Sequence, residues 1–160
     1  MIFGHSNNLN RIMSFTVKSN NPNLIYPCFL AIGLLSLYLT TMPNFATLED
    51  SGLFIAVAHE PGIAHPPGYP LYTILAHLLA WIPLGTVAQR VQTLSAFAGI
   101  AACLLLFKIC KKLGSDNFSA VIASTCHGVS SSFWFLAITA AVYTLNVMFF
   151  MFFLFSSEYP

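Results

Sequence analysis

The chain has 160 residues, of which 57% are hydrophobic and only 7% are charged. A soluble domain usually carries about 25% charged residues, so a chain this poor in charge could not cover a water-facing surface, and its composition indicates an integral membrane protein. The formal net charge of +1 excludes the strongly basic surface that nucleic-acid binding or a polybasic lipid anchor requires, and no nucleic-acid partner is expected.

Residues 1–23 are polar, and the first apolar run follows over residues 24–42. This run contains no charged residue and is long enough to cross about 30 Å of hydrocarbon as a helix. No small-residue cleavage site follows it, so the run is expected to remain as an uncleaved signal anchor rather than to be removed as a signal peptide.

Residues 44–88 are different, because they are rich in proline, glycine and charged side chains. Two short apolar segments lie within them, over 53–58 and 70–82. In the second segment, apolar residues recur at helical spacing along one face: Leu71, Ile74, Leu75, Leu78, Leu79 and Ile82. The segment is too short to span a bilayer, so it predicts a helix that lies in the membrane interface.

The rest of the chain predicts three further spans, over 91–109, 118–135 and 137–155. The expected fold is therefore an all-α integral membrane domain over 24–160, with four transmembrane helices and an outer loop that contains short interfacial helices. The connection between the third and fourth spans is almost absent.

Basic residues predict the orientation of the chain in the membrane. Arg11 and Lys18 precede the first span, and three lysines follow the second. By the positive-inside rule, both of these places are cytoplasmic. The N-terminus is then cytoplasmic, and the loop over 44–88 faces outward, toward a periplasm, the cell exterior or an organelle lumen.

The adjacent carboxylates Glu49 and Asp50 lie a few residues beyond the first span. Asp50 is a candidate general base, which could accept the proton of an attacking hydroxyl group. A purely structural interpretation is also open, because Thr47 and Asp50 have the spacing of a capping box, and Asp50 could cap the next helix directly.

The segment 65–71, His-Pro-Pro-Gly-Tyr-Pro-Leu, is the most unusual in the chain. Its three prolines restrict the backbone, so the segment should hold His65 and Tyr69 in fixed directions. It could equally be a rigid connector between two interfacial helices.

Arg90 lies at the outer end of the second span, where it is either a snorkelling cation or the counter-ion of a lipid phosphate. His127 lies within the third span and is either a hydrogen-bonded helix contact or a functional intramembrane group, as in a transporter.

No His/Cys cluster has metal-ligand spacing, so no metal site is predicted. The two adjacent carboxylates leave the use of a divalent ion open.

Three motifs together resemble a known family: Leu-Glu-Asp-Ser-Gly over 48–52, the Gly-to-Tyr run over 62–72, and Arg-Val-x-x-Leu-Ser over 90–95. They are similar to the N-terminal part of a family of animal membrane protein O-mannosyltransferases, whose many bacterial relatives are grouped only as a domain of unknown function. The similarity extends over about residues 30–150.

The resemblance implies a class C glycosyltransferase fold and a mannose-like sugar linked to a polyprenyl phosphate as the donor substrate, with no other cofactor. It places Asp50 at the acidic catalytic position in the first outer loop. His65 falls on the His-Pro-Pro-Gly motif and Arg90 on the Arg-Val motif, so Glu49, His65, Tyr69 and Arg90 are expected to bind substrate.

The chain departs from the family pattern at three positions. Leu53 and Ala141 stand where the family usually has glutamate, and Gln92 stands where it often has asparagine. Family members are also much longer, so we expect either the N-terminal piece of such an enzyme or a short relative that pairs with a membrane protein partner. A second interpretation is therefore a non-catalytic subunit or degenerate paralogue that binds lipid-linked sugar or a partner helix bundle.

Overall fold

The computed structural model describes residues 24–47, 50–60, 62–64, 66 and 68–157, and these residues form seven α-helices and no strand. The helices are α2 (Ile25–Thr41), α3 (Ser51–His59), α4 (Pro70–Ala80), α5 (Val87–Lys112), α6 (Asn117–Val129), α7 (Ser131–Ile138) and α8 (Tyr143–Ser157). The prediction of an all-α fold is confirmed for this part of the chain.

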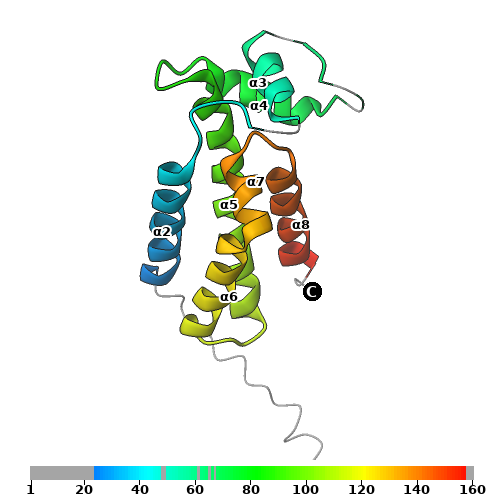
Figure 1. Ribbon diagram of the computed structural model, residues 1–160. Coiled ribbons are helices and arrows are strands. Elements are labelled where there is room, and N and C mark those ends of the chain that lie inside the picture. Colours follow the sequence, from blue (N-terminus) through cyan, green and yellow to red (C-terminus); the bar gives the residue numbers. More distant parts are fainter. Residues whose placement is uncertain (1–23, 48–49, 61, 65, 67, 158–160) are drawn as a thin grey trace, which may run out of the picture.

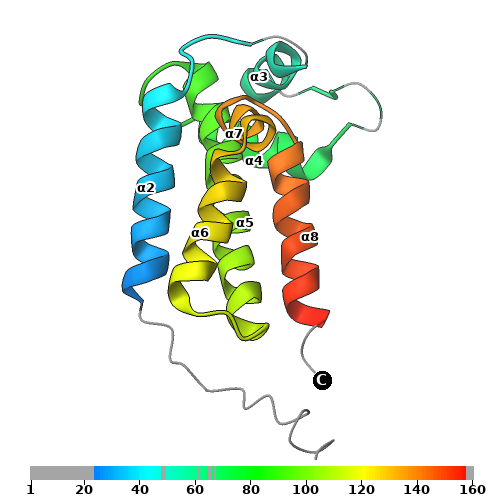
Figure 2. The same cartoon turned by 60° about the horizontal axis from the view of Figure 1, so that its bottom comes forward.

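Helix α5 is the centre of the molecule and contacts each of the other six helices. Helices α2, α6 and α8 stand beside it, and α3 and α4 lie across one end of this bundle (Figure 1). Figure 2 shows the same arrangement from a second direction, with α7 at the end that α3 and α4 cover. Small residues on α5 allow the close approach, because a Cβ at Gly99 would lie only 3.3 Å from Ala137 Cβ.

The four predicted transmembrane spans are only partly confirmed. Among the described residues, α5 alone is long and apolar enough to cross a membrane, and α6 with α7 would form a second span if the bent pair counts as one. Helices α2 and α8 are apolar but have 17 and 15 residues, fewer than the roughly 20 that a span requires. Helix α5 also begins at Val87, inside the predicted outer loop.

The predicted third span over 118–135 is divided in the structure into α6 and α7, which are bent by 66° at the break between them. The break falls at Ser130, whose hydroxyl donates to His127 O at 2.8 Å and so competes with the helical backbone. The hydroxyl of Tyr38, from α2, donates to Gly128 O at 2.8 Å and pairs this carbonyl at the break. The predicted fourth span begins at 137, whereas α8 begins at Tyr143.

The two short helices predicted before the second span are confirmed as α3 and α4. They are joined by His77, whose Nδ1 lies 2.7 Å from Ala58 O, while Trp81 Nε1 donates to His77 Nε2 at 3.1 Å. The buried face of α4 carries Tyr72, Ala76 and Ala80. The predicted apolar stripe faces outward: Leu71, Ile74, Leu78 and Ile82 are exposed. An exposed apolar face is what an interfacial helix requires, and the interfacial position itself stays a prediction.

Candidate active site

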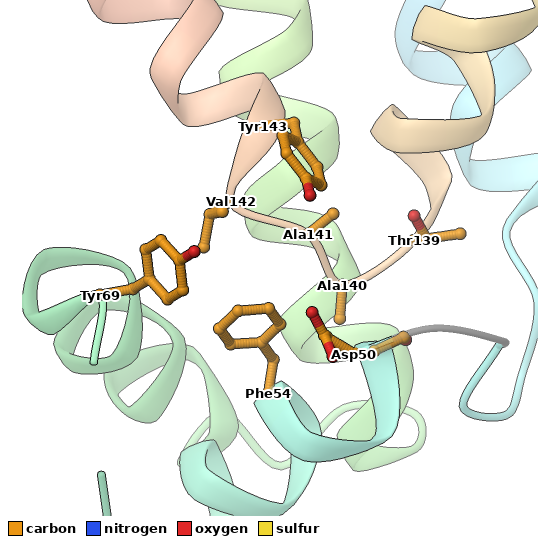
Figure 3. Close-up of a pocket in the computed structure, with 9 residues that line it drawn as sticks. Asp50, Phe54, Tyr69, Thr139, Ala140, Ala141, Val142 and Tyr143 are labelled. Atoms are coloured by element: carbon orange, nitrogen blue, oxygen red, sulfur yellow. The ribbon is translucent and has the colours of Figure 1, made fainter. Parts of the chain in front are cut away.

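A small cavity lies where the beginning of α3 faces the connection between α7 and α8 (Figure 3). Its volume is about 20 Å³. Three groups of residues line it: Asp50, Ser51 and Phe54 around the start of α3, Tyr69 at the start of α4, and Thr139, Ala140, Ala141, Val142 and Tyr143 from the α7–α8 connection and the first residue of α8. The cavity therefore joins the predicted outer loop to a segment about 90 residues later in the sequence.

Asp50 is the N-cap residue of α3, and its backbone carbonyl accepts the first helical hydrogen bond, from Phe54 N at 3.0 Å. Its side chain makes no capping hydrogen bond. The structural interpretation of this carboxylate as a helix cap is therefore wrong. Figure 3 shows the carboxylate directed toward Ala140, across the cavity. The candidate general base is thus placed at a cavity rather than on its own helix.

The connection that leads to Asp50 is tied to the first turns of α5. Gln92 is fully buried and its Nε2 donates to Phe45 O at 3.1 Å. One turn earlier, Gln89 Nε2 donates to Asn44 Oδ1 at 2.6 Å. These amide side chains hold residues 44 and 45, shortly before Asp50. Gln92 lies within the motif over 90–95, but no local pattern indicates that it contacts this segment.

Tyr69 has a left-handed backbone, with φ of 44°, and is the one non-glycine residue with positive φ in the described part of the chain. This conformation is costly for a residue that has a Cβ, and proline at position 70 restricts the preceding residue further. Tyr69 packs edge-on against Phe54, with ring centroids 5.7 Å apart. Strain of this kind concentrates at functional sites, and a substrate-binding role for Tyr69 stays a prediction.

A buried hydrogen-bond cluster around Ser95 of α5 holds the opposite wall of the cavity. The Ser95 hydroxyl donates to Ala141 O at 3.0 Å and accepts from Ala141 N at 3.2 Å. Since its one proton is used, the hydroxyl of Tyr72, 3.3 Å away, must donate to it. Burial raises the pKa of Tyr72 to about 12, while hydrogen bonds with Ser95 and Ala141 act in the opposite direction, so the phenol stays protonated at neutral pH.

Removing the Ser95 hydroxyl should destabilise the fold. Ser95→Ala leaves the Tyr72 hydroxyl and both backbone groups of Ala141 without this partner, and each buried unpaired group costs about 1–3 kcal/mol. We expect a loss of about 3 kcal/mol, about 1 kcal/mol for each of the three groups, measured as a lower Tm in detergent. Ser124→Ala is the matched control, because that buried hydroxyl donates only to Ala120 O of its own helix. Equal Tm values for the two variants would contradict the role of Ser95.

Arg90 lies elsewhere. Its guanidinium donates to Ala80 O, at the end of α4, and to Gly85 O at 3.3 Å. It lines a separate groove of about 320 Å³ whose other walls include Leu79, Ile82, Leu84 and Phe97. Tyr69 and Leu79 line different cavities at opposite ends of α4, and they are separated along the helix by roughly 15 Å, the rise over ten residues.

The structure therefore brings together Asp50 and Tyr69 but not Arg90. Glu49 and His65 lie outside the described residues. The sequence interpretation did not name Ser51 or Tyr143 as site residues, although Ser51 lies within the motif over 48–52. Among the residues described, His127 Nε2 has no hydrogen-bond partner, and its ring lies 4.2 Å from that of Phe133, so a hydrogen-bonded contact through this atom is not present.

Comparison with known proteins identifies related sequences. The family described as "Protein O-mannosyl-transferase TMEM260 N-terminal domain" matches residues 50–157. The protein O-mannosyl-transferase TMEM260 of Mus musculus is 38% identical over 115 residues, which cover 71% of this chain and 16% of the relative. Its Dictyostelium discoideum namesake is 31% identical over 103 residues, covering 62% and 13%. No solved structure matches. The chain thus spans about a sixth or less of the length of these relatives.

Proposed function

Because the chain belongs to the family of protein O-mannosyl-transferase TMEM260 N-terminal domains, as its motifs predicted, we propose that it forms the N-terminal part of a membrane glycosyltransferase. The proposed reaction moves a mannose-like sugar from a polyprenyl phosphate to an acceptor hydroxyl on the outer membrane face. The names of the relatives support a mannosyl donor and a protein acceptor. The observation that carries the proposal is the Asp50 carboxylate at the cavity between α3 and the α7–α8 connection.

In the proposed step, the Asp50 carboxylate accepts the proton of the acceptor hydroxyl. The acceptor oxygen forms a bond to the anomeric carbon of the sugar, and the bond from this carbon to the phosphate oxygen breaks, with its electron pair retained by the phosphate. A positioned general base contributes about 10²–10⁴-fold to the rate of such a transfer.

The residues that line the groove beside Arg90 support a lipid phosphate as its ligand. A guanidinium matches phosphate geometry, and the walls formed by Leu79, Ile82 and Leu84 would accept an isoprenoid tail. Since this groove lies at the other end of α4 from Asp50, the role of Arg90 in donor binding stays a prediction. The same holds for Glu49 and His65, for the use of a divalent ion, and for the outward orientation of the site.

The proposal is tested by a transfer assay with the protein in liposomes. Polyprenyl-phosphate mannose is the donor and a serine-containing peptide is the acceptor. We expect mannosylated peptide, with no product when the peptide serines are replaced by alanine. Hydrolysis of the donor without peptide labelling would contradict transfer to a protein hydroxyl.

A second candidate function is a non-catalytic membrane subunit, because Ala141 lines the Asp50 cavity at a position where the family usually carries glutamate. In this case the chain transfers nothing, and the double substitution Leu53→Glu with Ala141→Glu leaves transfer at zero. The matched control is Leu53→Gln with Ala141→Gln, which has the same size without the charge. Transfer gained by the glutamate variant alone would contradict a purely structural subunit.

A further inference from the structure

Tyr143, the first residue of α8, carries an aromatic side chain at the cavity that Asp50 also lines. Figure 3 shows the Tyr143 ring extending from the start of α8 toward Ala141, and the carboxylate of Asp50 directed toward the neighbouring Ala140. The two side chains therefore approach the same short piece of backbone, the α7–α8 connection, one from α8 and the other from the start of α3.

Most residues around this cavity offer a ligand little surface. The buried lining residues are Ser51, Phe54, Thr139, Ala140, Ala141 and Val142. By contrast, Asp50 is exposed, Tyr69 is half-buried and Tyr143 is 53% exposed. A ligand at this site can therefore reach one carboxylate and two tyrosine side chains.

The cavity volume keeps a sugar ring outside it. About 20 Å³ holds roughly one water-sized group, so a six-membered sugar ring cannot enter. In the proposed reaction the acceptor oxygen contacts both the Asp50 carboxylate and the anomeric carbon, so the sugar must lie at the rim, next to that carboxylate. Tyr69 is partly covered and packs edge-on against Phe54, so Tyr143 supplies the more open aromatic surface at the rim.

We propose that Tyr143 is a donor-sugar-binding residue, whose ring packs against the C–H groups on one face of the mannose-like sugar. This inference rests on the proposed function and specifies the donor subsite of that same site. The C–H face of a sugar ring is apolar, and a tyrosine ring offers it a flat, rigid contact area at a low cost in conformational entropy.

A tyrosine at the membrane–water boundary is the competing explanation, because tyrosine is enriched there. The two roles differ in the part of a lipid-linked sugar that they affect. Contact with the bilayer or the lipid does not depend on whether a sugar is attached, whereas contact with the sugar ring disappears when the sugar is absent. The position of Tyr143 at the Asp50 cavity favours contact with the sugar.

The test compares the binding of two lipids, polyprenyl-phosphate mannose and polyprenyl phosphate without the sugar, to the protein in nanodiscs. We expect Tyr143→Leu to bind the mannose-linked lipid about tenfold more weakly, and the sugar-free lipid as tightly as the wild type. Tyr143→Phe keeps the ring and should bind both lipids as the wild type does. Phe153→Leu is the matched control, because Phe153 is an exposed aromatic residue of the same helix that does not line the cavity.

Three binding results would overturn the proposal. The first is wild-type binding of the mannose-linked lipid by Tyr143→Leu. The second is an equal loss for both lipids, which would indicate contact with the phosphate, the lipid tail or the bilayer. The third is a loss in Tyr143→Phe as large as that in Tyr143→Leu, which would indicate the hydroxyl group rather than the ring.

Stability separates binding from a structural role. Because the Tyr143 side chain is exposed, Tyr143→Leu should keep the wild-type Tm, as the Phe153→Leu control should. A Tm lowered in Tyr143→Leu alone would contradict a role in sugar binding only.

Binding measured without an acceptor keeps this inference distinct from the proposed reaction. If the protein transfers no sugar, the proposed reaction fails, while the difference between the two lipids still decides the role of Tyr143. If transfer proceeds and Tyr143→Leu binds the mannose-linked lipid as the wild type does, the proposed reaction stands and this inference fails.

Discussion

Replacing Asp50 by asparagine is expected to lower the rate of sugar transfer by about 10²–10⁴-fold, the contribution of a positioned general base. Asparagine keeps the shape of the side chain but cannot take up the proton of the acceptor hydroxyl. The cavity should keep its form, because the Asp50 side chain makes no capping bond to α3 and the backbone bond to Phe54 N is retained. The fall should therefore appear in kcat, with an unchanged Tm.

Initial rates of peptide mannosylation in liposomes measure this effect. Glu60→Gln is the matched control, because that exposed carboxylate lies at the other end of α3 and does not line the cavity. We expect the control to transfer at the wild-type rate. Wild-type kcat in the Asp50→Asn protein would show that another group removes the proton.

Replacing Gly128 by valine is expected to cost about 3 kcal/mol of stability, the upper end of the usual cost of overpacking. A Cβ at this position would lie 2.9 Å from Leu34 Cδ2 and 3.1 Å from Cys103 Sγ. Both neighbours are buried, so neither can move away freely. The substitution would push α6 from α2 and α5 and disturb the bond from Tyr38 to Gly128 O.

The Tm in detergent, or the midpoint of unfolding in denaturant, measures this loss. Gly33→Val is the control for the change of residue type, because Gly33 also lies within a helix but a Cβ there would meet no atom within 4 Å. The control should be as stable as the wild type or slightly more stable, since valine has a higher helix propensity than glycine. Equal loss in both variants would show that the packing at Gly128 is loose.

The motifs identified Asp50 and Tyr69 as site residues, and the structure places both at one cavity. The sequence could not identify the residues on the opposite side of this cavity, which come from the α7–α8 connection. Ala141 reaches Ser95 across 46 residues, and nothing in the local pattern of either segment indicates this contact. The motif around Arg90 suggested a shared site with Asp50, whereas the guanidinium contacts the opposite end of α4.

The sequence by itself predicted a membrane protein, and it determined the two short helices before α5 and the family. These depend on composition, on the spacing of apolar residues within a few turns, and on short motifs. Only the tertiary structure decided the rest. The break between α6 and α7 at Ser130 lies beside Gly128, whose carbonyl accepts a hydrogen bond from Tyr38, 90 residues away in the sequence. Such contacts depend on how the helices pack together, and packing involves segments that local sequence patterns treat as independent.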